Sequence, residues 1–244
     1  MKNNTTLMDA INYRRSVRVY DENKEIDSEI VKKCIQQATL APNSSNMQLW
    51  EFHHITSKTI LNKLAIACLG QSAAVTAKEM LVVVVRKDLW KKRAKENLTY
   101  LEKLFGKKPK EKYTGREKFA LNYYKKIMPF VYGDFFGIYG YIKYLISWLT
   151  GLFRPTYRQL RKSDMRIVAH KSAGLAAQTF MLSMAAEGYD TCPMEGNDSL
   201  RIKKILNLPS KSEINMVISC GIRKPEGIYG ERFRIAFEKV YKKW

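Results

Sequence analysis

Residues 80–85 read MLVVVV, an unbroken run of large apolar side chains that is mostly β-branched. Successive side chains of a strand point to opposite faces of a sheet, so a strand of this composition is stable only when both faces are covered. The chain must therefore place other elements on both sides of a central sheet. Two more strands are predicted at 50–55 (WEFHHI) and 214–222 (INMVISCGI).

Helical periodicity occupies much of the remaining chain. Apolar residues recur at helical spacing at Ile30, Val31, Cys34 and Ile35, for example. Because helices separate the strands, we expect an α+β or α/β layer fold with a central sheet. The predicted helices span 5–14, 27–41, 61–69, 167–188 and 199–208, and a loop is predicted over 192–198. The predicted caps are Thr5 or Thr6, Asp27 or Ser28, Asp198 or Ser199, and Gly188 at a C-terminal end.

Charge and cysteine usage narrow the classes of partner and site. Lys and Arg number 43 against 23 Asp and Glu, a net charge of +20 that suggests an anionic partner: nucleic acid, a membrane surface or a phosphorylated ligand. A merely basic, soluble surface is the alternative. The four cysteines are scattered and only three histidines are present, so we expect neither a disulfide framework nor a metal site. The first residues lack an apolar signal core, which predicts a cytoplasmic protein.

The segment RRSVR at 14–18 places three arginines around a hydroxyl. A guanidinium group offers a planar fork of donors that can grip a phosphate with two hydrogen bonds. The segment therefore predicts a phosphate site, with a solvated basic turn as the alternative. No GxGxxG, P-loop or G-x-S-x-G motif accompanies it, so a Rossmann, P-loop or serine-hydrolase site is not expected.

Three further clusters suit binding rather than nucleophilic attack. The loop 41–50 (APNSSNMQLW) offers uncharged donors and acceptors, unless it is only a turn between helix and strand. The segment 193–196 (PMEG) can direct backbone N–H groups at a ligand. Arg232 and Arg234 in the tail can supply further phosphate donors.

Four segments, taken in order, resemble the motifs of the FMN-dependent nitroreductase family: RRSVRVYD, APNSSNMQLWEF, AAQTFMLSMAAEGYDTCPMEG and the basic C-terminal pair. The resemblance covers roughly residues 7–86 and 166–236. It implies a three-layer α+β fold with a central, mainly antiparallel sheet flanked by helices, in an intertwined homodimer. It also implies bound FMN, NADH or NADPH as transient reductant, and a ping-pong transfer to a small-molecule acceptor such as a nitroaromatic or quinone.

The resemblance also assigns residues to the cofactor. The phosphate and one edge of the ring would be held by Arg14, Arg15, Ser16, Arg18, Arg232 and Arg234. The loop expected from the partner subunit contributes Pro42, Asn43, Ser44, Asn46 and Gln48. The segment that would lie under the ring comprises Pro193, Met194, Glu195 and Gly196. A backbone N–H of Glu195 or Gly196 would face the flavin N5. Gln71 would be another ring contact. No catalytic side chain is expected, because a flavin supplies the redox chemistry itself.

Two departures from the family pattern affect the expected pocket. Leu49 replaces a proline and Asn43 replaces a serine, which alters pocket shape and hence substrate more than FMN binding. Two other functions stay open: a flavoprotein with a different reaction, dehalogenation or flavin fragmentation, and a non-enzymatic protein whose basic surface binds nucleic acid or a membrane. No specific nucleic acid is expected.

We predict that residues 1–244 form one nitroreductase-like domain with a basic and aromatic insertion at about 87–165. Its stretch 127–153 is aromatic and apolar between basic flanks, and has three interpretations: a lid over the flavin, a peripheral helix on an anionic membrane surface, or a transmembrane span. The small residues of 173–186 suggest either the core of the dimer interface or burial within one subunit.

Overall fold

The computed structural model describes residues 5–133 and 138–244. In those ranges the sheet has four strands in the order β1-β2-β4-β3, each antiparallel to its neighbour. The strands are β1 (Trp50–Ile55), β2 (Glu79–Val85), β3 (Asp190–Met194) and β4 (Glu213–Gly221).

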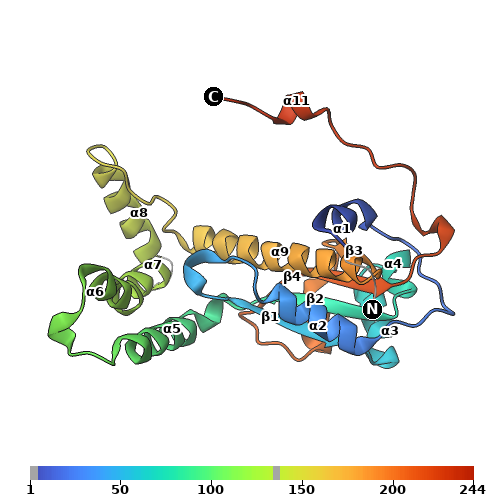
Figure 1. The fold of residues 1–244 in the computed structure, drawn as a ribbon, viewed down its shortest axis with the longest axis horizontal. Helices are drawn as coiled ribbons and strands as arrows, with labels where there is room; N and C mark the ends of the chain where they lie inside the picture. The colour runs from blue at the N-terminus through green and yellow to red at the C-terminus, as the bar shows by residue number, and fades with distance from the viewer. Residues whose placement is uncertain (1–4, 134–137) are drawn as a thin grey trace.

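Strand β2 determines the layering, as the run MLVVVV predicts. Its side chains alternate between two cores, and all of them are buried. Leu81, Val83 and Val85 join the core under α2 (Ser28–Ala38) and α9 (Lys162–Ala186). Met80, Val82 and Val84 join the core under α3 (Lys58–Ala67), α4 (Ser72–Val75) and α10 (Ser199–Ile205). The predicted three-layer α+β fold is therefore confirmed (Figure 1).

The predicted caps are also confirmed. Thr6 begins α1 (Leu7–Tyr13) in a capping box with Asp9, and the Asp27 side chain accepts from the Glu29 N–H at the start of α2. Asp198 caps α10 by accepting from the Arg201 N–H. Gly188 has φ +78° two residues beyond α9, the left-handed conformation that ends many helices.

Several boundaries were predicted wrongly, including the ends of α2 at Ala38 rather than 41 and of α10 at Ile205 rather than 208. The loop expected over 192–198 begins as β3, which tolerates Pro193 because an edge strand can lack one ladder donor. The helix expected at 61–69 begins at Lys58, and α9 begins at Lys162 rather than 167. Both helices start with polar residues, which periodicity of apolar residues does not detect.

Three alanines of α9 are buried within the subunit. Ala173, Ala176 and Ala177 have no exposed surface, because α9 packs on α2 and on the sheet. These three alanines are therefore covered within one subunit, whereas Gly174 on the solvent side of the helix is not, so a role of 173–186 in a dimer interface stays a prediction. The solvent side of α9 presents Leu175 and Gln178 instead.

Residues 87–165 form helices that extend away from the sheet (Figure 1). They comprise α5 (Trp90–Phe105), α6 (Gly115–Asn122), a π-helical turn at Tyr123–Ile127, α7 (Met128–Tyr132) and α8 (Ile138–Thr150). Short 3-10 turns lie at Ser44–Asn46, Lys87–Leu89, Lys110–Lys112 and Pro225–Gly227. Residues 134–137 of the predicted aromatic stretch lie outside the described residues. None of the helices in the described ranges has the length and apolar character needed to cross a bilayer.

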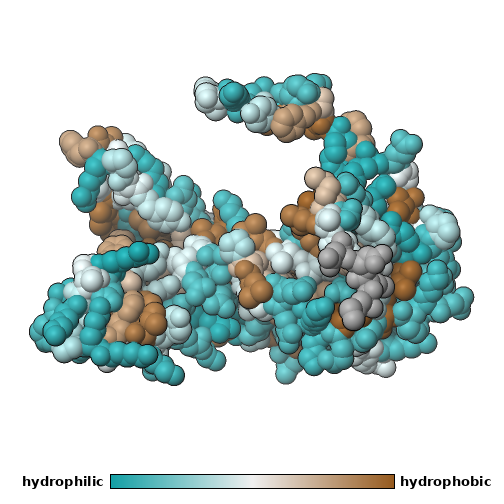
Figure 2. Space-filling view, in the orientation of Figure 1, coloured by the Kyte–Doolittle hydropathy of each residue, from teal (hydrophilic) through white to brown (hydrophobic). Residues whose placement is uncertain are grey.

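The C-terminal tail leaves the body as an extended, exposed chain that carries the short helix α11 (Phe237–Val240). Figure 2 shows the tail and the helices of 87–165 projecting on either side of a hollow. Apolar side chains of the tail face solvent, and Phe233 is 81% exposed.

Candidate functional site

The segment 14–18 runs along the outer edge of β3. Ser16 forms a parallel bridge with Thr191, and the Val17 N–H donates to the Thr191 carbonyl at 3.2 Å. The Arg18 N–H donates to the Gly227 carbonyl at 2.7 Å. These bonds fix the backbone of Val17 and Arg18 in place. The side chains of the segment are then the groups that can reach a ligand.

Four arginines gather at this edge. Burial lowers the pKa of the half-buried Arg14 guanidinium, and the positive charges of Arg232, Arg234 and Arg15 lower it further. Burial raises the pKa of the Cys192 thiol in β3, and the charges of Arg18 and Arg14 oppose that rise, so both lie near this strand. A group of like charges is unfavourable by itself and is stabilised by a bound anion. The residues present therefore fit a phosphate.

Both ends of the chain contribute to this arginine cluster (Arg14, Arg15, Arg232 and Arg234). The Arg232 guanidinium donates to the carbonyls of Ile11, Asn12 and Arg14, at the C-terminal end of α1. The Arg15 guanidinium donates to the Gly230 carbonyl at 2.8 Å. The tail is thereby tied to the segment after α1, as the sequence motifs predict.

An ion pair that the sequence analysis missed supports the arginine cluster. Arg223, just after β4, donates to the buried carboxylate of Asp190 through Nε at 2.7 Å and through its backbone N–H at 2.8 Å. Its guanidinium also lies 4.2 Å from the centre of the Tyr13 ring. Asp190 is thus paired with Arg223. No local motif signals a pair that is separated by 33 residues.

The segment after β3 lies beside the start of α4. Gln71 Nε2 donates to the Gly196 carbonyl at 2.8 Å and to the Cys68 carbonyl at 3.0 Å, which brings this predicted residue to the predicted loop. Met194 is buried and Pro193 half-buried, whereas Glu195 and Gly196 are exposed. The N–H groups of Glu195 and Gly196 donate to no atom of the described chain, so a ligand can use them.

The loop at 42–48 lies elsewhere in the subunit. The Ser44 N–H donates to Ser172 Oγ at 3.2 Å, in the first half of α9, whereas Tyr13 at the arginine cluster contacts Gly188 beyond its end. Sixteen residues of helix separate these positions by roughly 24 Å. The structure therefore does not bring Pro42, Asn43, Ser44, Asn46 and Gln48 to the arginine cluster of the same chain.

The helices of 87–165 hold this loop in an unusual backbone conformation. Asn46 exchanges hydrogen bonds with Asn97 of α5, and Ser45 Oγ shares one with the Tyr123 hydroxyl at 2.7 Å. Ser45, Asn46 and Gln48 have φ values of 54°, 49° and 47°, in the left-handed region that costs energy for residues other than glycine. Three such residues within four positions indicate a loop shaped for a function. Asn97, Tyr123 and Ser172 were not predicted.

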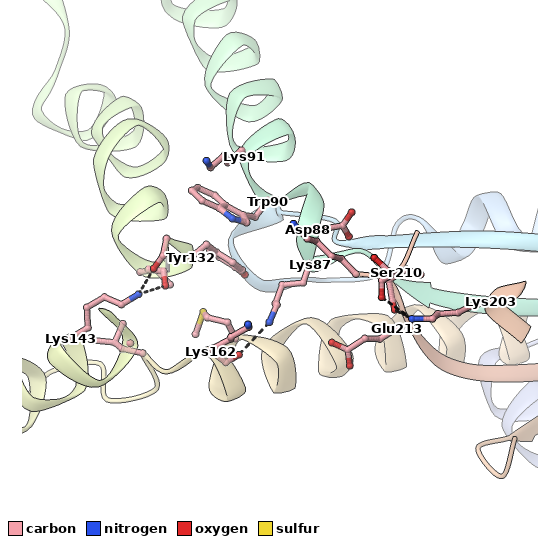
Figure 3. Close-up of a pocket in the computed structure, with 17 residues that line it drawn as sticks. Lys87, Asp88, Trp90, Lys91, Tyr132, Lys143, Lys162, Lys203, Ser210 and Glu213 are labelled. Atoms are coloured by element: carbon pink, nitrogen blue, oxygen red, sulfur yellow. Dashed lines mark hydrogen bonds between the residues drawn. The ribbon is translucent and has the colours of Figure 1, made fainter. Parts of the chain in front are cut away.

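A cavity lies away from the arginine cluster, between α5, α7, α8 and the body (Figure 3). It has a volume of about 900 Å³ and contains none of the predicted site residues. A smaller cavity of about 280 Å³ is lined by Ser44 and Ser45 together with Tyr123, Tyr132 and Tyr157. Burial raises the pKa of Tyr132 to about 12. The smaller cavity thus adjoins the 42–48 loop.

The histidines and cysteines take structural positions. His54 Nε2 lies 2.6 Å from Glu79, and His170 contacts Glu213 and Asn215. The four cysteines are free and buried. No cluster of potential metal ligands occurs in the part of the chain that the structure describes.

Comparison with known proteins decides the family. The profile of the Nitroreductase family matches residues 11–222. The chain belongs to the nitroreductase family. This confirms the resemblance seen in the motifs and makes the chain a nitroreductase-family oxidoreductase.

Relatives and solved structures agree with this assignment. "Putative NAD(P)H nitroreductase MhqN" of Bacillus subtilis is 27% identical over 218 residues, covering 88% of each chain. Protein DrgA of Synechocystis is 25% identical over 224 residues, covering 92% of this chain and 87% of its own. A "putative nitroreductase in complex with FMN" from Exiguobacterium sibiricum superposes with a TM-score of 0.67 at 22% identity, covering 98% of both chains. The Bacillus subtilis nitroreductase-fold structure ydfN gives a TM-score of 0.73 at 24% identity, covering 97% of this chain and 98% of that one.

Proposed function

We propose that this nitroreductase-family chain binds FMN and uses NADH or NADPH to reduce a small acceptor such as a nitroaromatic compound or a quinone. The observation that carries the proposal is the arginine cluster, in which guanidinium groups from both chain ends meet beside β3. The Exiguobacterium relative is described with FMN, and MhqN is named for NAD(P)H.

Four arginines hold the phosphate: Arg14, Arg15, Arg18 and Arg234. The Ser16 hydroxyl adds a neutral donor. Arg232 donates to three carbonyls and so positions Arg14 in addition to contributing charge. Each hydrogen bond from a guanidinium to phosphate contributes about 1.5–3 kcal/mol. Two or three such bonds are enough to make the phosphate a main determinant of affinity.

Pro193, Met194, Glu195, Gly196 and Gln71 lie under or beside the ring. The exposed N–H groups of Glu195 and Gly196 orient its N5 edge, and Gln71 holds the loop through the Gly196 carbonyl. When bound, FMN would supply the redox chemistry for hydride transfer from the nicotinamide and for the later reduction of the acceptor. The protein contributes binding, orientation and positive charge, without a catalytic side chain.

The functional unit in this proposal is a homodimer. The residues of the 42–48 loop lie roughly 24 Å along α9 from the arginine cluster of their own chain, so they complete the site of a partner subunit. These residues are Pro42, Asn43, Ser44, Asn46 and Gln48. The projecting tail and the hollow beside it leave room for a second chain (Figure 2). The smaller cavity beside Ser44 and Ser45 would then open toward the partner's flavin.

Anaerobic spectroscopy of the purified protein tests the proposal. The protein should take up FMN with one cofactor per chain, and NADH or NADPH should bleach the visible flavin absorbance. A nitroaromatic or quinone should then restore the absorbance without oxygen. A protein that takes up no FMN, or whose bound flavin neither nicotinamide reduces, would contradict the proposal.

A further inference from the structure

Helix α8 presents its apolar side chains to solvent and its polar side chains to the protein. Gly140, Lys143 and Ser147 recur at spacings of three and four residues and are buried, and Lys143 is only 2% exposed. The opposite side is exposed and apolar, and it continues past the end of the helix. We call this the α8 face: Ile138, Tyr141, Ile142, Leu145, Ile146, Trp148, Leu149, Leu152 and Phe153.

Specific contacts fix this orientation. Lys143 Nζ donates to the carbonyls of Phe130, Val131 and Gly133, at distances of 3.0, 2.9 and 2.8 Å. These carbonyls lie at the end of α7, and Figure 3 shows the Lys143 side chain reaching toward them. Ser147 Oγ donates to the Tyr157 carbonyl at 2.6 Å. Rotating the helix would leave these carbonyls unpaired, which costs free energy when they are buried.

Gly140 permits the helix to lie close to the following chain. A Cβ at this position would be in van der Waals contact with the backbone of Arg161 and Lys162 at 3.4 Å. The polar side of α8 is therefore adapted to the body of the protein. The α8 face remains uncovered in the subunit, and an apolar patch of this extent usually marks an interaction surface.

The segment that carries the α8 face is strongly basic. Residues 87–165 hold 19 of the Lys and Arg residues against 7 Asp and Glu, which amounts to +12 of the net charge of +20. Lys125, Lys126 and Arg154 are exposed and pair with no acidic group among the described residues. Two copies of such a segment repel each other, whereas an anionic surface attracts it.

We infer that the α8 face docks on an anionic lipid bilayer, with α8 lying in the plane of the headgroups. Trp148 and Tyr141 suit the boundary between headgroups and acyl chains, and Lys and Arg side chains of the same segment reach the lipid phosphates. A helix of 13 residues is too short to span the roughly 30 Å hydrocarbon core, so the contact is peripheral. The inference is independent of the proposed reaction.

Co-sedimentation of the full chain with vesicles, with and without added FMN, tests this inference. The protein should pellet with phosphatidylcholine vesicles that contain phosphatidylglycerol and much less with phosphatidylcholine alone, and added salt should weaken binding. Leu145→Glu should weaken binding by about tenfold or more, because the apolar side chain no longer enters the bilayer. Leu104→Glu, at an exposed position of α5, adds the same charge in the same segment and should weaken binding far less.

Other results would overturn the inference. Equal loss in Leu145→Glu and Leu104→Glu would show attraction by charge alone, and absence of pelleting would remove the bilayer as the partner. Retained FMN and an unchanged circular dichroism spectrum establish that Leu145→Glu is folded. A change in oligomeric state in Leu145→Glu alone would assign the α8 face to a second copy of the chain.

Discussion

The guanidinium of Arg232 donates to the backbone carbonyl of Arg14, so residues 218 positions apart in the chain meet at one point of the fold. The bond ties the C-terminal tail to the segment after α1. It explains how a phosphate site can draw on both ends of the chain. The position of the tail residues at Arg232 is therefore part of the structure of the site.

The pairing of Asp190 with Arg223 should be needed for stability. Asp190→Asn removes the charge from a carboxylate that is 2% exposed and leaves the Arg223 guanidinium without its counter-ion. We expect the free energy of unfolding to fall by about 3 kcal/mol. Urea denaturation of this variant, compared with Asp9→Asn at an exposed cap, measures the effect; a loss no larger than that of the control would contradict it.

Stability should decrease at alkaline pH. Burial raises the pKa of Cys34 from 9.0 to about 12 in the folded chain, so between these values the unfolded state loses a proton that the folded state keeps. Each such proton lowers the free energy of unfolding by about 1.4 kcal/mol per pH unit. Denaturation midpoints from pH 8 to 11 should fall, and less steeply in Cys34→Ala. An identical slope in both proteins would exclude this thiol as a source.

Complementation tests whether the 42–48 loop serves the partner. Arg14→Ala removes a phosphate ligand, and Asn43→Ala removes the side chain whose Oδ1 accepts from the Gln48 N–H at 2.9 Å. Each homodimer should be nearly inactive. A hybrid dimer, isolated with two different tags, should regain about half of the wild-type activity because one of its two sites carries neither change. A hybrid as inactive as the parents would place the loop in the site of its own chain.

The loop conformation should depend on α5. Asn97→Ala removes two hydrogen bonds to Asn46, at 2.9 and 3.0 Å. Because three residues of the loop hold left-handed φ values and the loop is assigned to the flavin site, we expect it to relax, lowering FMN affinity and raising the KM for the acceptor several-fold. Steady-state kinetics with a titration of FMN measures both effects. Unchanged FMN affinity together with an unchanged KM would contradict the assignment.

The sequence predicted the layers of the fold because the evidence for them is local. The run MLVVVV requires cover on both faces of β2, and the caps at Thr6, Asp27 and Asp198 are short-range signals that the structure confirms. The segment RRSVR and Arg232 could be assigned to one site because the family motifs occur in order. Their assignment to FMN stays a prediction.

Other features depend on contacts that no local pattern reveals. Strand β3 is short and contains Pro193, so it resembles a loop until β4 pairs with it. The alanines of α9 suit a dimer interface or an internal one equally well, and only the fold shows that α2 and the sheet cover them. Similarly, the hydropathy of α8 indicates two faces, but the bonds of Lys143 determine that the apolar one faces solvent.

FMN and riboflavin differ by the phosphate, so their dissociation constants in the wild type, Arg14→Ala and Arg232→Ala measure phosphate binding by the arginine cluster. We expect the wild type to prefer FMN strongly, and each substitution to weaken FMN binding by about tenfold or more while riboflavin binding stays nearly constant. Arg116→Ala, on exposed α6, should change neither constant. An unchanged ratio of the two constants in both site variants would show that these guanidinium groups do not bind the phosphate.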